Sequence, residues 1–179
     1  SCDSLVRRPG IVSRGWKNIA PKLEDCREHG HDSRAELFIV EGDSAAKAVA
    51  AVRDQEFQAV LPMQGKPLNA AKANHLTIAQ NGLFKFVFEA IGLSPQKINI
   101  QECRFSRIIM LFDPDADGIH CGALMMIFFY KTLLPLLECG KICLVRAPLF
   151  RFTIQPSTSP KTHEIRYAYS QEEAWKLME

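Results

Sequence analysis

Three aspartates stand at alternate positions near the middle of the chain, and their spacing points to chemistry with a metal ion. Asp113, Asp115 and Asp117 are followed at once by Gly118, in the sequence DPDADG. Carboxylates this close repel one another unless a hard cation or several N–H donors neutralise their charge. The triplet therefore predicts a site for a divalent cation such as Mg²⁺, and a solvated acidic turn is the simpler alternative.

The residues before the triplet have the pattern of a buried strand. Residues 108–112, IIMLF, are apolar without alternation, which is typical of a strand in a parallel sheet that helices cover on both faces. Ligands of such sheets bind beyond the carboxyl ends of the strands. The aspartates fall at that position.

A second acidic residue follows another apolar run. Residues 37–40, LFIV, precede Glu41, and the alanine-rich residues 44–54 then favour a helix that Ser44 can cap. Parallel strands that each end in an acid place those acids at the same edge of the sheet. We therefore expect Glu41 to join the aspartates, although a surface carboxylate is the common alternative for a single glutamate.

Two other protein families share part of this sequence pattern. A calcium loop of the D-x-D-x-D-G type requires Glu where this chain has Leu124, and helices flank it, so that interpretation is excluded. A phosphatase that forms an aspartyl phosphate would use Asp115 as nucleophile and Asp117 as acid. Its pattern continues with Thr where this chain has Ile119, and it stays a minor alternative.

Histidines and cysteines offer weaker signals. Cys26 with His29 and His31 lacks the fourth partner that a zinc site requires. His120 follows the aspartates at the start of an expected helix, where it would either orient a ligand or cap the helix.

Five ordered blocks of sequence, taken together, resemble one protein family. They are KLEDC at 22–26, EGDSA at 41–45, FQAVLPMQGKPLNAAKA at 57–73, DPDADGIH at 113–120 and FFYKTLLPLLECGKICLVRAPLF at 128–150. Glutamate after one strand and DxDxDG after another resemble the topoisomerase–primase (Toprim) domain, and the blocks resemble the B subunit of DNA gyrase or of topoisomerase IV. The resemblance implies an α/β fold, with a Rossmann-like parallel sheet flanked by helices.

The resemblance also implies a role for each acidic residue. Glu41 is the expected general acid/base and a ligand of a catalytic Mg²⁺, which Asp113 shares. Asp113 with Asp115 would hold a second Mg²⁺ position, and Asp117 is expected as a further or water-mediated ligand. A metal and a carboxylic acid supply what transesterification of DNA needs, which is charge neutralisation at the phosphate and a proton for the leaving 3′ oxygen.

Two basic residues are expected to contact DNA. Lys66, in PMQGK, resembles a lysine that approaches the DNA backbone, and Arg53 aligns with a basic residue at the end of the first helix. Without the resemblance, both are ordinary surface cations. The nucleophilic tyrosine is expected on the A subunit, so Tyr130, Tyr167 and Tyr169 are interpreted as packing residues.

The leading hypothesis is an Mg²⁺-binding Toprim fragment of a gyrase-like type IIA topoisomerase B subunit. It would contribute metal and acid/base groups to double-strand cleavage and religation of DNA, within an ATP-dependent A2B2 heterotetramer in the cytoplasm, associated with the nucleoid. No nucleotide-binding motif is visible, so ATP is expected only in the full-length protein. The fragment alone is expected to be inactive.

The chain also departs from the family pattern. Ala46 and Lys47 replace the two glycines of EGDSAGG, and Gly122 replaces a basic residue. The alternative from another class is therefore a degenerate Toprim module that acts as a non-catalytic scaffold for DNA or subunit contacts. Gyrase, topoisomerase IV and a divergent paralogue all remain open.

Length and composition set the remaining limits. The 179 residues suit one domain with extensions, and we expect a lead segment at 1–34, the Toprim domain at 35–155 and a loop, short strand and helix at 156–179. A net charge of only +2 argues against tight independent binding to nucleic acid. No apolar run has the length of a membrane span.

Overall fold

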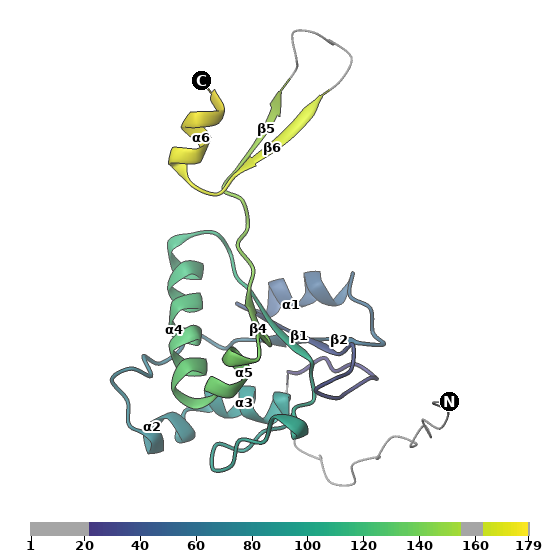
Figure 1. Ribbon diagram of the computed structural model, residues 1–179, viewed down its shortest axis with the longest axis vertical. Coiled ribbons are helices and arrows are strands. Elements are labelled where there is room, and N and C mark those ends of the chain that lie inside the picture. Colours follow the sequence, from purple (N-terminus) through teal and green to yellow (C-terminus); the bar gives the residue numbers. More distant parts are fainter. Residues whose placement is uncertain (1–21, 155–162, 179) are drawn as a thin grey trace, which may run out of the picture.

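A computed structural model describes residues 22–154 and 163–178 (Figure 1). Its main body is a parallel four-stranded sheet flanked by helices, which confirms the expected Rossmann-like α/β fold. The sheet has the order β2-β1-β3-β4. The strands are β1 (Glu36–Val40), β2 (Gln58–Pro62), β3 (Arg107–Leu111) and β4 (Ile142–Leu144), and the helices are α1 (Asp43–Ala50), α2 (His75–Gln80), α3 (Gly82–Ile91), α4 (Ala116–Thr132) and α5 (Leu134–Glu138), with a short 3₁₀ turn, η1 (Ile100–Glu102), before β3.

The strands bury apolar side chains on both faces, as their lack of alternation predicts. One face, formed by Leu37, Ile39, Ala59, Leu61, Ile108 and Met110, belongs to the large core, which α3, α4 and α5 cover. The opposite face packs Val40 and Val60 against Ala46 of α1. Successive strand residues point to opposite faces, so each strand contributes to both cores.

Aromatic packing joins two of the covering helices. Phe84 of α3 stacks on Phe128 of α4, with ring centroids 4.1 Å apart, and Phe88 meets the same ring edge-on. Such pairs add to the stabilisation that burial of their surface provides. These contacts hold α4 against α3.

The order of the strands creates one point where the chain changes direction across the sheet. From β1 the chain crosses through α1 to β2 on one side, and β3 lies on the other side of β1. Val40 pairs with Leu111, so β1 and β3 end side by side. Ligands of open α/β sheets bind at such switch points.

The mostly apolar residues 124–137 lie in two helices instead of one. Helix α4 ends at Thr132 and α5 begins at Leu134, with the intervening Leu133 at φ −134° and ψ 35°. Pro135 lies in the first turn of α5, where its missing N–H costs nothing. None of the helices in the two described ranges is long and apolar enough to cross a membrane.

A hairpin and a helix follow the main body and project from it in Figure 1. Strands β5 (Phe150–Ile154) and β6 (Glu164–Ala168) pair antiparallel, and α6 (Gln171–Met178) follows. Ser170 accepts a hydrogen bond from the Glu173 N–H, and the Glu173 carboxylate accepts one from the Tyr169 N–H. This reciprocal cap at Ser170 begins the terminal helix. The loop expected at 156–160 lies outside the described residues.

The described part of the expected lead segment packs on the sheet. Glu24 exchanges two backbone hydrogen bonds of 2.9 Å with Val60 of β2, and Cys26 is buried. Residues 1–21 lie outside the described ranges. The domain boundaries stay predictions.

Candidate metal and acid–base site

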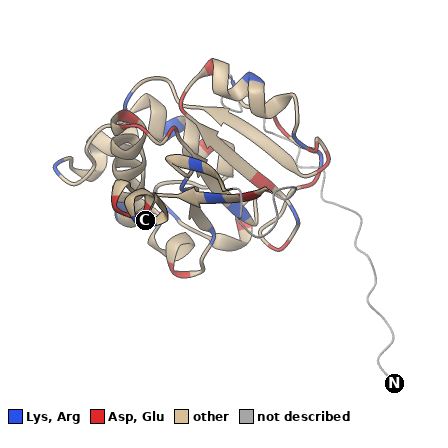
Figure 2. Cartoon of the chain, turned by 90° about the horizontal axis from the view of Figure 1, so that it is seen from above, with Lys and Arg blue, Asp and Glu red and all other residues tan. Residues whose placement is uncertain are grey.

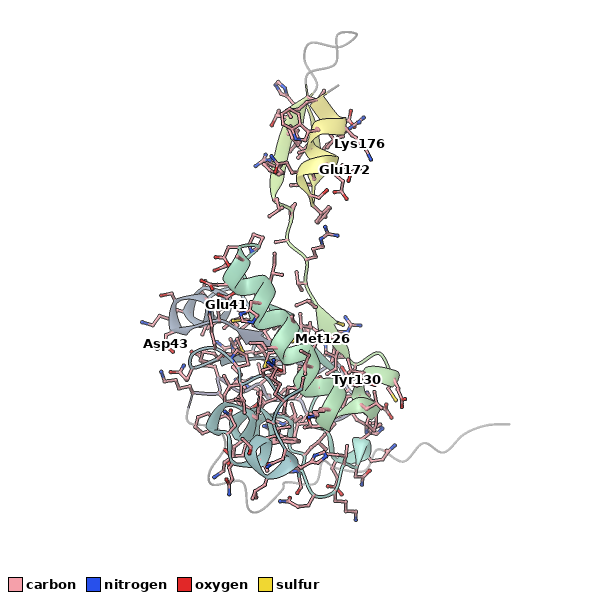
Figure 3. All side chains as sticks on the ribbon, turned by 90° about the vertical axis from the view of Figure 1, so that its left-hand side faces the viewer. Glu41, Asp43, Met126, Tyr130, Glu172 and Lys176 are labelled. Atoms are coloured by element: carbon pink, nitrogen blue, oxygen red, sulfur yellow. The ribbon has the colours of Figure 1, made fainter. Side chains whose placement is uncertain are left out.

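Glu41 and the aspartate turn meet at the edge where β1 and β3 end. Glu41 follows β1 directly and is half-buried, and its Oε1 accepts a hydrogen bond of 2.9 Å from the backbone N–H of Asp113. Figure 3 shows Glu41 beside the end of α4 at which that helix begins. The structure thus joins the Glu41 carboxylate to the backbone of the aspartate turn, 72 residues away in the sequence.

Gly118 allows this close approach. A Cβ at position 118 would overlap the backbone oxygen of Asp113 and lie 2.6 Å from Oε1 of Glu41. Any other residue there would push the first turn of α4 away from Glu41. The glycine that closes the DxDxDG motif is therefore required by packing at the site.

Asp115 and Asp117 each have a partner within the chain. Asp115 is the N-cap of α4, and its Oδ1 accepts a hydrogen bond of 2.7 Å from the Gly118 N–H. Asp117 lies 2.7 Å from the Lys66 ammonium. The hydrogen bond and charge of Lys66 lower the pKa of Asp117, and the same contact raises the pKa of Lys66.

The donor chemistry of this edge fits a hard divalent cation. Asp113, Asp115 and Glu41 offer only carboxylate oxygens, and both aspartates are exposed. Among the described residues, no side-chain hydrogen bond engages Asp113, and only one oxygen of Asp115 is engaged. No three of these acidic groups bring their oxygens within 4.8 Å of one another, so a shared ion would require rotation of the exposed aspartates.

The segment that carries Lys66 follows β2 and is held at both ends. Gly65 has φ +84°, a conformation that favours glycine, and it turns the chain toward α4. Further along, the Lys131 ammonium of α4 donates to the carbonyls of Ala70, Ala71 and Ala73, at 2.7, 3.1 and 2.9 Å. Lys66 thus reaches the acidic edge from an anchored loop.

Arg53, the other expected DNA contact, lies apart from the acidic edge. Its side chain is only 9% exposed, its guanidinium donates to the backbone carbonyls of Asp25 and Gln58, and Glu24 lies 3.8 Å away. These contacts favour a structural role, and its contact with DNA stays a prediction without support from this geometry. In the view of Figure 2, Lys and Arg are interspersed with Asp and Glu.

The residues that depart from the family pattern have different surroundings. Ala46 is buried against Val40 and Val60, and Lys47 is exposed on α1. Gly122 lines an apolar cavity of about 450 Å³ together with Phe112 and other residues. All four carboxylates of the predicted site are nevertheless present.

Two smaller expectations are wrong, and one of two alternatives for His120 is excluded. Gly42, not Ser44, is the N-cap of α1, and no side chain caps that helix. His120 lies in the second turn of α4, behind the capping Asp115, so it does not cap the helix, and its orientation of a ligand stays a prediction. Tyrosines interpreted as packing residues are exposed, Tyr130 by 66%, Tyr167 by 50% and Tyr169 by 39%. Figure 3 shows Tyr130 on the outer side of α4.

A second cluster of titratable groups lies ahead of β3, at the opposite edge of the sheet. Donor atoms of Asp25, Cys26 and His29 lie within 4.8 Å of one another. His31, which the sequence grouped with Cys26, pairs with Asp32 at 2.8 Å instead. Sequence reasoning missed the central residue, Arg104, because nothing in its spacing links it to Asp25, 79 residues away.

Arg104 occupies the acceptors of this cluster. Its guanidinium donates to the Asp25 carboxylate and to the backbone carbonyl of Ala90, and lies 2.7 Å from the His29 ring nitrogen. Burial alone raises the pKa of Asp25, but hydrogen bonds from His29 and Arg104 outweigh it and lower the pKa to about 2. Burial raises the pKa of the Cys26 thiol to about 11, so the thiol stays protonated. The cluster is an internal ion-pair network.

An open parallel sheet with Glu41 after β1 and three aspartates after β3 defines the Toprim class of fold. The family model described as the Toprim domain matches residues 36–147. The chain belongs to the Toprim domain family.

Comparison with curated proteins adds particular relatives. The chain is 38% identical over 159 residues to the DNA gyrase B subunit of Archaeoglobus fulgidus, a match that covers 88% of this chain and 24% of that protein. It is 36% identical to the DNA gyrase B subunit of Thermus thermophilus, over 94% of this chain and 26% of that protein. The corresponding protein of Mycoplasmoides gallisepticum is also 36% identical, over 89% of this chain and 24% of that protein. The chain spans about a quarter of the length of these relatives.

Proposed function

We propose that this chain is the Toprim part of a gyrase-like type IIA DNA topoisomerase B subunit. It would bind Mg²⁺ and supply acid/base chemistry for cleavage and religation of double-stranded DNA, with a tyrosine supplied by an A subunit. The observation that carries the proposal is the contact of Glu41 with the Asp113 turn where β1 and β3 end. The identity to gyrase B subunits along most of the chain supports it.

Each acidic residue has a distinct task in this proposal. Glu41 and Asp113 would hold the catalytic ion, and Asp113 with Asp115 a second one, because these groups retain carboxylate oxygens that no described side chain engages. A bound divalent cation would neutralise charge on the scissile phosphate. Protonated Glu41 would donate its proton to the leaving 3′ oxygen and recover it on religation. The hydrogen bond from the Asp113 N–H would orient Glu41 for this role.

The surroundings of the site belong to the same proposal. The complete protein would use ATP and assemble with the A subunit as an A2B2 heterotetramer in the cytoplasm, associated with the nucleoid. This chain alone would not cleave DNA, because half of the active site, including the tyrosine nucleophile, would come from the A subunit.

DNA cleavage by the reconstituted enzyme tests the role of Glu41. The complete B subunit that carries this chain is combined with its A subunit, and cleavage of supercoiled DNA is compared for the wild type and Glu41→Gln. Glutamine keeps the shape of the side chain but cannot transfer a proton, so cleavage should fall about a hundredfold or more. Glu36→Gln is the matched control, because Glu36 lies at the other end of β1. Equal cleavage by Glu41→Gln and the wild type would refute the acid/base role.

A scaffold without catalysis is the second candidate. The observation that favours it is the spread of the carboxylates, of which no three converge within 4.8 Å in the described chain. In that case, Asp113→Asn in the same reconstituted enzyme would reduce neither cleavage nor religation. A large loss of cleavage in Asp113→Asn would exclude the scaffold.

A further inference from the structure

We infer that Asp117 is a counter-ion that holds Lys66 at the acidic edge until a DNA phosphate replaces it, and that Asp117 does not ligate the metal. The inference deepens the proposed function, on which it rests, because it assigns Lys66 and Asp117 separate tasks within the same site. It predicts an exchange in which the Lys66 ammonium moves from the Asp117 carboxylate to a phosphate oxygen.

The geometry of the ion pair carries this inference. Lys66 Nζ lies 2.7 Å from Asp117 Oδ1, joining the loop after β2 to the first turn of α4. The loop turns at Gly65, and Lys131 holds it further along through the carbonyls of residues 70, 71 and 73. The backbone of this anchored loop therefore places the Lys66 ammonium beside the acidic edge.

The solvent exposure of the pair makes the exchange inexpensive. The Lys66 side chain is 57% exposed and that of Asp117 is 73% exposed. Exposed ion pairs contribute little to stability because water solvates the separated charges well. A phosphate oxygen offers the ammonium another charge-assisted hydrogen bond. The fold thus loses little stability when a phosphate replaces Asp117 as the partner of Lys66.

The other two aspartates are engaged differently. Among the described residues, Asp113 has no side-chain hydrogen bond, and Asp115 uses one oxygen to cap α4. Asp117 alone of the three pairs with a cationic side chain in that part of the chain. The Lys66 ammonium beside Asp117 repels an approaching cation, whereas Asp113 and Asp115 have no cationic side-chain partner in the described chain, so these two are the favoured ligands. The triplet therefore divides into ligands and a counter-ion.

The experiment measures two affinities on this 179-residue chain. One is binding of a fluorescent blunt DNA duplex by anisotropy at low salt, and the other is binding of Mn²⁺ by electron paramagnetic resonance. The variants are Asp117→Asn, Lys66→Gln, the double variant and, as the matched aspartate control, Asp113→Asn. Circular dichroism establishes that each variant is folded.

The expected result is selective. Asp117→Asn should bind the duplex about threefold more tightly than the wild type, because Lys66 is released, and should keep its Mn²⁺ affinity within about twofold. The double variant should bind the duplex no more tightly than Lys66→Gln alone. Asp113→Asn should lose about tenfold or more in Mn²⁺ affinity.

Three outcomes would overturn the inference. Loss of Mn²⁺ affinity in Asp117→Asn equal to that in Asp113→Asn would make Asp117 a ligand. An equal gain in duplex binding with and without Lys66 would mean that only the lost negative charge matters. Absence of a gain, including absence of duplex binding by every variant, would show that a released Lys66 does not bind phosphate. Unchanged Mn²⁺ binding in Asp113→Asn would instead count against the proposed metal site.

Discussion

Two clusters at opposite edges of the sheet invite comparison. At the amino-terminal edge, Asp25, Cys26 and His29 converge within 4.8 Å, yet His29 and Arg104 both engage the Asp25 carboxylate. At the carboxyl edge, no three of the acidic side chains bring their oxygens within 4.8 Å of one another, yet the Asp113 carboxylate has no described side-chain partner. Ligand atoms can therefore lie close together and still be unavailable to a metal ion, because other side chains already engage them.

For binding of a metal ion, a carboxylate free of other partners matters more than a close group of ligand atoms. A half-buried carboxylate that a guanidinium satisfies gives up that partner only at a high cost, because its charge would be left desolvated. An exposed carboxylate can exchange water for a cation at little cost. We therefore assign the structural role to the Asp25 cluster and propose the metal role for the Glu41 edge.

The largest expected effect is loss of the arginine from the structural cluster. Arg104→Ala removes the guanidinium, whose side chain is only 12% exposed, from Asp25 and from the Ala90 carbonyl. The free energy of unfolding should fall by about 3 kcal/mol, because a partly buried carboxylate loses its partner. Urea denaturation measures the change.

A second arginine provides the control for this change. Arg107 pairs with Glu36 at 3.4 Å, and its side chain is 56% exposed. Arg107→Ala should reduce the free energy of unfolding by less than about 1 kcal/mol. An equal loss in the free energy of unfolding for Arg104→Ala and Arg107→Ala would contradict the greater importance of the partly buried Arg104 contacts.

The second prediction concerns acid. The folded pKa of Asp25, about 2, lies below its ordinary value of 3.8. The stabilisation by this group is therefore complete above about pH 4 and is lost as the pH falls toward about 2. It amounts to about 2 kcal/mol at most. Urea denaturation between about pH 2 and pH 5 should show a smaller pH dependence for Asp25→Asn, and identical slopes would contradict the assignment.

The third prediction tests the carboxyl edge through its glycine. A Cβ in Gly118→Ala would displace the α4 turn from Glu41, so affinity for Mn²⁺ should fall about tenfold or more. Gly82→Ala is the matched control, because a Cβ at that helix position meets nothing within 4 Å. Electron paramagnetic resonance reports the bound Mn²⁺. Unchanged affinity in Gly118→Ala would show that the contact with Glu41 does not form the site.

The smallest expected effect comes from the lysine that anchors the Lys66 loop. Lys131→Met keeps the aliphatic stem but removes three hydrogen bonds to backbone carbonyls. The free energy of unfolding should fall by about 1 kcal/mol, and amide exchange should rise in the loop at residues 64–73. Lys85→Met, which removes a long exposed pair with Glu89 at 3.9 Å, should change neither. Unaltered exchange in Lys131→Met would show that the loop does not need this anchor.

Much of the fold could be predicted because its signals are local. The apolar runs before Glu41 and Asp113 predicted two buried parallel strands, and the structure pairs Val40 with Leu111 at their ends. Because parallel strands end at the same edge of a sheet, the acidic residues that follow them could be predicted to lie at one edge.

The remaining features depend on contacts between distant residues. The pairing of Lys66 with Asp117 spans 51 residues and that of Arg104 with Asp25 spans 79, so neither leaves a pattern in the sequence. Tyr130 is apolar in pattern but faces outward on α4. The family resemblance gave Arg53 a DNA contact, whereas tertiary packing surrounds it with backbone carbonyls. These assignments required the arrangement of the chain in space.

A single crystallographic measurement tests the central distinction most directly. Crystals of this chain are soaked in Mn²⁺, and an anomalous difference map is calculated around both clusters. A peak is expected at ligand distance from Asp113 and Glu41, and none between Asp25 and His29. A peak at the Asp25 cluster with none beside Asp113 would contradict it.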